Sequence, residues 1–209
     1  MREILRQMGR SGMILAGFAM VSVLVVAATY HGTRERITRA QQQALAMQLD
    51  TLVPPARYDN QPTADTLQLR DAAFGSDSEG TVYRARKAGQ PVALLTTIVA
   101  ADGYAGPIQL LVAVNADGRL AGVRVLSHKE TPGLGDAIDI ERSNWISHFD
   151  GRSLDDPAEA QWKVKKDGGV FDQFTGATIT PRAVVKAVHR FLEYERDHRA
   201  ALYAAEKTR

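Results

Sequence analysis

Residues 107–130 read PIQLLVAVNADGRLAGVRVLSHKE, two apolar runs separated by Asn115-Ala116-Asp117-Gly118. Both runs are rich in aliphatic and β-branched residues, which are common in strands. The segment between them consists of residue types that favour turns. This stretch therefore predicts a β-hairpin, and the fold is expected to contain an antiparallel sheet.

The preceding segment has the same organisation. Residues 81–104 read TVYRARKAGQPVALLTTIVAADGY and predict two strands around Ala88-Gly89. The two hairpins together predict an antiparallel meander. Residues 56–80 are polar and rich in turn formers, so we expect connecting structure there with at most short elements.

An uncharged segment, GMILAGFAMVSVLVVAATY, occupies residues 12–30. A helix of that length rises roughly 28 Å, close to the hydrocarbon thickness of a bilayer. A cleaved signal peptide is the rival interpretation, but the apolar run is longer than usual for one, which favours a retained anchor. Arginines on both sides leave the orientation open. Residues 35–49 then have helical apolar spacing that ends near Pro54-Pro55.

Composition excludes several classes of protein. The chain has 209 residues, of which 44% are hydrophobic, enough for one buried core after the anchor. Its net charge of +2 gives no broad basic field for nucleic acid. It has no cysteine, so disulfides and thiolate sites are excluded. The histidines are scattered without a spacing typical of a metal site; they are His31, His128, His148, His189 and His198.

A glycine-rich loop follows the second hairpin. Residues 127–136 read SHKETPGLGD, in which Pro132, Gly133 and Gly135 predict a tight turn. Glycines also let a backbone lie close to a flat or anionic ligand, and the residues alone do not distinguish this role from an ordinary turn. Residues 143–151, SNWISHFDG, then predict a short helix. Its Trp145 is expected to pack into the core, with the alternative that it borders a planar ring near the glycine-rich loop.

Three threonines precede the next helix. Residues 172–185 read DQFTGATITPRAVV, and Thr180-Pro181 is a typical helix start with threonine as the N-cap. A phosphate on Thr178 would lie near the positive end of this helix, with the hydroxyls of Thr175 and Thr180 as donors. The residues alone leave open the alternative that all three threonines are turn and capping residues.

Taken together, the single N-terminal span, SHKETPGLGD and DQFTGATITP resemble the G subunit of Rnf (Rsx) electron-transport complexes, a family related to the C subunit of the sodium-pumping NADH:quinone oxidoreductase. In that family the signature [ST]GAT carries FMN on its final threonine, which by position is Thr178. The resemblance implies a cofactor site for covalent FMN that also includes Thr175, Gly176, Ala177, Ile179, Thr180, Glu130, Thr131, Gly133, Leu134 and Gly135. Asp172 is implied to help a flavin transferase recognise the site.

The resemblance also implies the architecture and the partners. The expected class is α/β (α+β), with one transmembrane helix and a single FMN-binding domain made of an antiparallel sheet and packed helices. The expected boundaries are a cytoplasmic N-terminus at 1–10, the transmembrane helix at 11–31, a helical linker at 32–55 and a periplasmic domain at 56–209. The implied location is the bacterial inner membrane, and the implied partners are the other complex subunits and the flavin transferase.

The implied function is an electron relay that uses FMN and has no substrate site of its own. Such complexes pass electrons between ferredoxin and NAD and couple this transfer to ion movement. Two alternatives remain open at this point: a stand-alone membrane-anchored flavoprotein reductase, and an anchored interaction domain without redox chemistry. The last segment, residues 193–209, predicts a charged helix with little apolar face, exposed to solvent or to a partner.

Overall fold

The computed structural model describes residues 2–75 and 79–204. The chain divides into two compact units, Met1–Met47 and Gln48–Arg209. Helix α1 (Arg2–Leu52) forms the first unit and continues into the second. Within α1, Leu15–Arg34 is the one stretch of the described chain that is long and apolar enough to cross a membrane. The predicted apolar helix and the predicted linker helix are thus a single helix.

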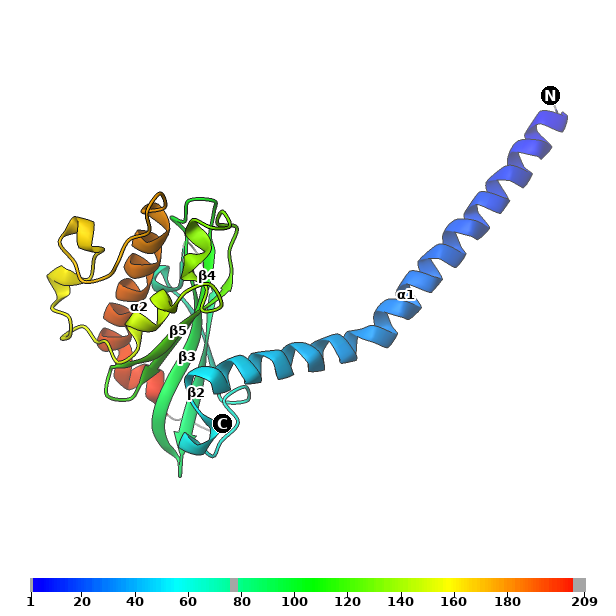
Figure 1. Ribbon diagram of the computed structural model, residues 1–209. Helices are drawn as coiled ribbons and strands as arrows, with labels where there is room; N and C mark the ends of the chain where they lie inside the picture. Colours follow the sequence, from blue (N-terminus) through cyan, green and yellow to red (C-terminus); the bar gives the residue numbers. More distant parts are fainter. Residues whose placement is uncertain (1, 76–78, 205–209) are drawn as a thin grey trace. The chain divides into compact units, whose positions relative to one another are not determined.

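The second unit is built on a five-stranded antiparallel meander with strand order β1-β2-β3-β4-β5 (Figure 1). The strands are β1 (Thr66–Arg70), β2 (Glu79–Lys87), β3 (Gln90–Ala100), β4 (Ile108–Asn115) and β5 (Leu120–Ser127). Both predicted hairpins are confirmed. Ala88 and Gly89 join β2 to β3 with φ of 50° and 75°, as a turn with two left-handed residues requires. The strand β1 lies in the segment that was expected to hold only short elements.

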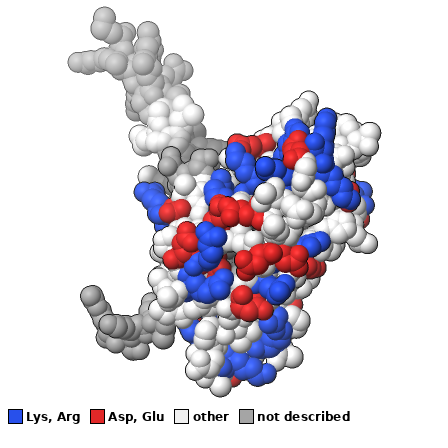
Figure 2. All heavy atoms as spheres, turned by 90° about the vertical axis from the view of Figure 1, so that its left-hand side faces the viewer, with Lys and Arg blue, Asp and Glu red and all other residues white. Residues whose placement is uncertain are grey.

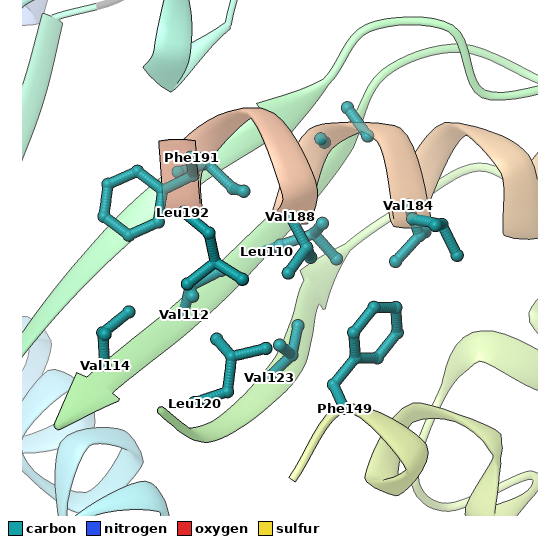
Figure 3. Close-up of a cluster of buried hydrophobic side chains, with 14 of the residues drawn as sticks. Leu110, Val112, Val114, Leu120, Val123, Phe149, Val184, Val188, Phe191 and Leu192 are labelled. Carbon is teal, nitrogen blue, oxygen red and sulfur yellow. The ribbon is translucent and has the colours of Figure 1, made fainter. Parts of the chain in front are cut away.

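Helix α2 (Ile179–Tyr203) packs along one face of the sheet. Its apolar side chains meet those of β4 and β5, and Phe149 from the short 3-10 helix Asn144–Phe149 closes one end of this core (Figure 3). The labelled core residues are Leu110, Val112, Val114, Leu120, Val123, Phe149, Val184, Val188, Phe191 and Leu192. Trp145 is also buried, as its position in the sequence predicts. The core therefore fixes α2, and with it the turn that precedes α2.

The last turn of α1, from Gln48 onward, belongs to the same unit as the sheet. Leu49, Leu52 and Val53 are buried. A Cβ atom built on Gly122 of β5 would lie 2.7 Å from Leu52 Cδ2, so this turn sits directly against the strand. A glycine at 122 thus allows the helix end to approach the sheet closely.

The C-terminal half of α2 corrects one expectation. The segment after Leu192 was expected to have little apolar face, but Leu202 and Tyr203 are buried. Glu195 is buried as well, and its carboxylate accepts two hydrogen bonds of 2.8 Å from Arg199. Apolar spacing missed this face because a paired glutamate occupies a core position.

Candidate functional site

Phe174 to Ala177 form a tight turn immediately before α2. The Ala177 amide donates to the Phe174 carbonyl over 3.2 Å, and Gly176 at the third position has a φ of 81°. A positive φ at that position of a turn is readily adopted by glycine and costs other residues energy. Thr175 and Gly176 are exposed at the tip of this turn, and Thr178 follows it half-buried.

The start of α2 differs from the prediction. The helix begins at Ile179, its N-cap is Thr178, and Pro181 lies in the third helical position instead of the first. Among the described residues, the Thr178 side chain makes no capping hydrogen bond. Its hydroxyl is therefore not engaged in holding the helix end. The side chain of Ile179, next to it, is 47% exposed.

Thr180 is not the N-cap, and its hydroxyl does not face the turn as a phosphate donor. The residue is fully buried, and its Oγ1 donates to Glu130 Oε2 over 2.6 Å. The prediction was wrong because a Thr-Pro pair marks a helix start only statistically. Here the Thr180 hydroxyl donates to the buried Glu130 carboxylate, and the N-cap is Thr178, two residues earlier than predicted.

The glycine-rich loop lies against this turn. The amides of Leu134 and Gly135 both donate to the Thr131 carbonyl over 3.1 Å, which closes the loop. A Cβ atom built on Gly176 would lie 3.4 Å from Leu134 Cδ2. Thr131 and Gly133 lie exposed on the same loop. Two motifs that are 42 residues apart in the sequence thus meet at one end of the sheet.

Glu130 points inward from this loop. It is 4% exposed, and its Oε1 accepts the amide of Ala105 over 3.0 Å while its Oε2 accepts Thr180. Its own amide donates to His128 Nδ1 over 3.0 Å. The carboxylate therefore joins the 101–107 loop, the glycine-rich loop and the first turn of α2.

Asp172 lies two residues before the turn. Its carboxylate is half-exposed and pairs with Lys165 Nζ over 2.6 Å, and its carbonyl accepts the Trp145 indole N–H over 2.7 Å. The Trp145 ring also meets Phe174 edge to face, with ring centres 5.2 Å apart. The backbone before the turn is thus fixed to the core, while the Asp172 side chain remains accessible.

Two ion pairs flank the first turns of α2. Arg182 donates to Asp167 over 2.5 and 2.6 Å, and these hydrogen bonds hold the pKa of Asp167 below its usual value. Lys186 donates to Asp102 over 2.6 Å and lowers the pKa of that carboxyl in the same way. Figure 2 shows basic and acidic side chains interspersed on the face on the α2 side of the sheet. The surface near the site is charged but has no single sign.

The chemistry of this end of α2 fits a phosphate ester carrying a flat ring. The amides of Ile179 and Thr180 belong to the first turn, where N–H groups have no partner within the helix and where the helix dipole favours an anion. Leu134, which lies beside Gly176, is 44% exposed, and Tyr104, on the loop whose Ala105 amide binds Glu130, is 69% exposed. No motif in the sequence points to Tyr104, because only the contact between Ala105 and Glu130 brings its loop to the site.

A separate group of possible metal ligands lies farther along α2. One ligand atom each from Glu159, His189 and Glu193 lie within 4.8 Å of one another. Sequence spacing did not reveal this group, because Glu159 comes from a distant loop. His189 is eleven residues beyond Thr178, about 16 Å along the helix, so the group is distinct from the turn.

Comparisons with known proteins find two matching family profiles and several similar proteins. The profile of the FMN-binding domain family matches residues 103–193, and that of the RnfG N-terminal region matches residues 1–52. The chain is 50% identical over 203 residues to the G subunit of the ion-translocating oxidoreductase complex of Pseudomonas aeruginosa, covering 97% of this chain and 95% of that protein. It is 46% identical over 197 residues to the G subunit of the same complex in Pseudoalteromonas atlantica, covering 94% and 92%. It is 49% identical over 194 residues to the G subunit from Cereibacter sphaeroides, covering 93% and 87%.

Proposed function

Because the chain belongs to the family of G subunits of the ion-translocating oxidoreductase (Rnf) complexes, we propose that it relays electrons through an FMN held in phosphoester linkage on Thr178. Its FMN-binding domain and its candidate membrane helix are those of a flavoprotein of a membrane electron-transport complex. Beyond this family membership, we propose the covalent link, its position on Thr178 and the electron relay.

One observation carries the choice of Thr178. The turn and the glycine-rich loop meet through Gly176 and Leu134, and Thr178 stands beside them with a hydroxyl that makes no cap. Of the other two threonines, Thr180 already donates to Glu130. Thr175 lies three residues earlier, at the exposed tip of the turn and outside the helix start. A phosphate on Thr178 would lie closest to the free amides of α2.

Attachment requires a flavin transferase and FAD. The Thr178 Oγ would attack the phosphorus on the FMN side of the FAD pyrophosphate, forming an Oγ–P bond. The P–O bond to the adenylate breaks, AMP leaves, and the hydroxyl proton passes to a base of the transferase. The chain's own contribution is to present Thr178 in an accessible turn, with the exposed Asp172 nearby as the recognition element.

When bound, FMN supplies one- and two-electron chemistry, while the protein determines its position and surroundings. The residues that would hold it are those around the turn: Leu134, Ile179 and Tyr104 offer apolar surface, and the first-turn amides offer donors to the phosphate. Because this surface is exposed, partner subunits can approach the cofactor. Those partners would supply and accept the electrons in a chain linked to ferredoxin and NAD.

The proposed location is the bacterial inner membrane. Residues 1–10 would lie in the cytoplasm, 11–31 would cross the membrane, 32–55 would form the linker, and 56–209 would lie in the periplasm. The candidate span Leu15–Arg34 supports the membrane crossing. The absence of cysteine is compatible with an oxidising compartment.

The intact mass of the full chain, coexpressed with a flavin transferase, tests the proposal. We expect the wild-type chain to gain one FMN less one water, and Thr178→Val to gain nothing. Thr178→Ser keeps a hydroxyl and should accept FMN. FMN on Thr178→Val, or none on the wild type, would refute the assignment.

A further inference from the structure

We infer that Glu130 is a positioning residue for FMN attachment: its buried carboxylate, acting through the Thr180 hydroxyl, holds the start of α2 so that Thr178 is presented to the transferase. This inference rests on the proposed attachment of FMN to Thr178. It assigns Glu130 and Thr180 a role behind the cofactor site, without direct contact with the cofactor.

Both carboxylate oxygens of Glu130 are engaged within the protein. Oε2 accepts from Thr180, which is fully buried, over 2.6 Å, and Oε1 accepts from the Ala105 amide over 3.0 Å. With 4% of its surface exposed, Glu130 cannot reach a ligand on the surface without giving up these bonds. The hydrogen bond to Thr180 connects positions 50 residues apart in the chain, two residues from the proposed attachment site.

The surrounding backbone is shaped around this carboxylate. A Cβ atom built on Gly135 would lie 2.7 Å from Glu130 Oε2 and 2.9 Å from Thr180 Oγ1. A Cβ atom built on Gly103 would lie 2.2 Å from the Gly106 carbonyl oxygen and 3.0 Å from Glu130 Oε1. Real Cβ atoms essentially never come within 3.0 Å of a neighbour, so Gly135 leaves the space that the carboxylate and the Thr180 hydroxyl fill, whereas Gly103 is required by the backbone of its own loop. The side chain is therefore held from three directions.

The cost of this arrangement points to a role beyond stability. Glu130 takes part in none of the ion pairs between described residues, and its carboxylate is bonded by neutral donors alone. Burying a carboxylate without a cation is unfavourable, and apolar side chains of similar volume usually stabilise a fold as well or better. What the carboxylate provides and an apolar residue would not is a directional bond that fixes the first turn of α2.

His128 binds the backbone of Glu130. Its Nδ1 accepts the Glu130 amide over 3.0 Å, and its Nε2 lies 2.9 Å from Asp139 Oδ2. The acceptor role of Nδ1 places the ring proton on Nε2, facing Asp139. Glu130 is thus fixed through its backbone as well as its side chain.

The test is a matched pair of variants at Thr180 in the full chain. Thr180→Val keeps the shape and removes the hydroxyl, whereas Thr180→Ser keeps the hydroxyl. The rate of FMN attachment by a flavin transferase with FAD is followed by intact mass, and amide hydrogen exchange of residues 174–182 is measured on the flavin-free chain. We expect Thr180→Val to accept FMN about ten- to a hundredfold more slowly, as misplacement of a reacting atom by about 1 Å can cause.

The expected pattern also includes faster amide exchange in the turn of Thr180→Val, with Thr180→Ser near the wild type in both measurements. Glu130→Gln places an NH₂ group opposite one of the two donors and should slow attachment as well. Should Thr180→Val fail to fold, Glu130→Gln and Thr180→Ser give the same comparison.

Attachment to Thr180→Val at the wild-type rate, with unchanged exchange in the turn, would overturn the inference. If the wild-type chain itself accepts no FMN, the proposed function fails. The exchange measurement then still decides the positioning role, since unchanged protection of the turn in Thr180→Val would refute it.

Discussion

The three threonines at and before the start of α2 share one side-chain chemistry but occupy three environments. Thr175 is exposed, Thr178 is half-buried at the N-cap, and Thr180 is fully buried against Glu130. Periodicity and capping preferences could not separate them, because the partner of Thr180 lies 50 residues away in the chain. The assignment of Thr180 as the N-cap was wrong because its hydroxyl binds this distant partner. Thr178 was chosen from the resemblance to known flavinylation motifs.

Gly176 should be required at the tip of the turn that Phe174 to Ala177 form. Its φ of 81° costs a residue with a Cβ about 1–2 kcal/mol, so Gly176→Ala should lower the free energy of unfolding by that amount in a urea titration. The new methyl group would lie in ordinary contact with Leu134, so the strained φ is what would shift the residues before Thr178 and slow the attachment of FMN.

Gly168→Ala is the matched control for Gly176→Ala. Gly168 has a φ of 86° with open space around its Cβ position, so it should lose similar stability and keep the wild-type rate of attachment. Equal attachment rates for the two variants would mean that the turn does not determine how the threonine is presented.

At the scale of secondary-structure elements, both hairpins could be predicted because apolar runs and turn residues are local signals. The strand β1 has a weaker pattern and is defined by its pairing with β2, from Thr66 with Tyr83 to Arg70 with Glu79. The buried C-terminal end of α2 was missed because its burial depends on contacts with distant strands: Tyr203 donates to the Val114 carbonyl over 3.2 Å.

Two arginines of β2 hold the end of α2. Arg84 and Arg86 share Asp65, at 2.5 and 2.7 Å, and donate to the carbonyl of Ala204. Asp65→Asn would leave two largely buried guanidinium groups without their counter-charge, so we expect a loss of about 3 kcal/mol or more in urea unfolding.

The exposed pair of Arg70 and Glu79 gives the comparison for Asp65→Asn. Both side chains are 73% exposed, so Glu79→Gln should change stability by less than about 1 kcal/mol. If Asp65→Asn and Glu79→Gln lose similar free energies of unfolding, burial does not increase the contribution of the ion pairs that Arg84 and Arg86 make with Asp65.

Alkaline pH should weaken the same end of α2. Burial raises the pKa of Tyr203 above its usual value of 10.0, with the charge of Glu195 as the next cause. Because the folded pKa is the higher one, the contribution of the protonated phenol is present below pH 10 and is lost as the pH rises through the folded pKa.

Tyr203→Phe cannot ionise, so it isolates this effect. It should cost about 1 kcal/mol at neutral pH for the lost hydrogen bond, and its stability should decline less than that of the wild type above pH 10. If the unfolding temperatures of the wild type and Tyr203→Phe fall equally between pH 9 and 11, groups other than Tyr203 cause the sensitivity to alkaline pH.

At the scale of the whole molecule, the chain consists of a helix that contains one candidate membrane span and a compact unit that begins at Gln48. The uncharged run at residues 12–30 predicts a candidate membrane helix ahead of this unit, because the bilayer sets the required length. The way in which the last turn of α1 packs on Gly122 could not be predicted, since it depends on the sheet being formed.

A chain that starts at Gln48 should remain folded and leave the membrane. Its core residues all lie within residues 48–204, so its thermal unfolding should match that of the same unit in the full chain. In a membrane flotation assay the full chain should float with the lipid and the shortened chain should not. A shortened chain that still floats would place the membrane attachment in the second unit.

The central claim is that FMN is attached to Thr178, and fragmentation mass spectrometry of one peptide tests it most directly. Trypsin cleavage after Lys166 and Arg182 releases residues 167–182, DGGVFDQFTGATITPR, which contain all three threonines of the site. With the chain matured by a flavin transferase, the FMN mass should appear in every fragment that includes Thr178 and be absent from fragments that end at Ala177 or begin at Ile179. An FMN mass located on Thr175 or Thr180, or a peptide with no added mass, would contradict the account.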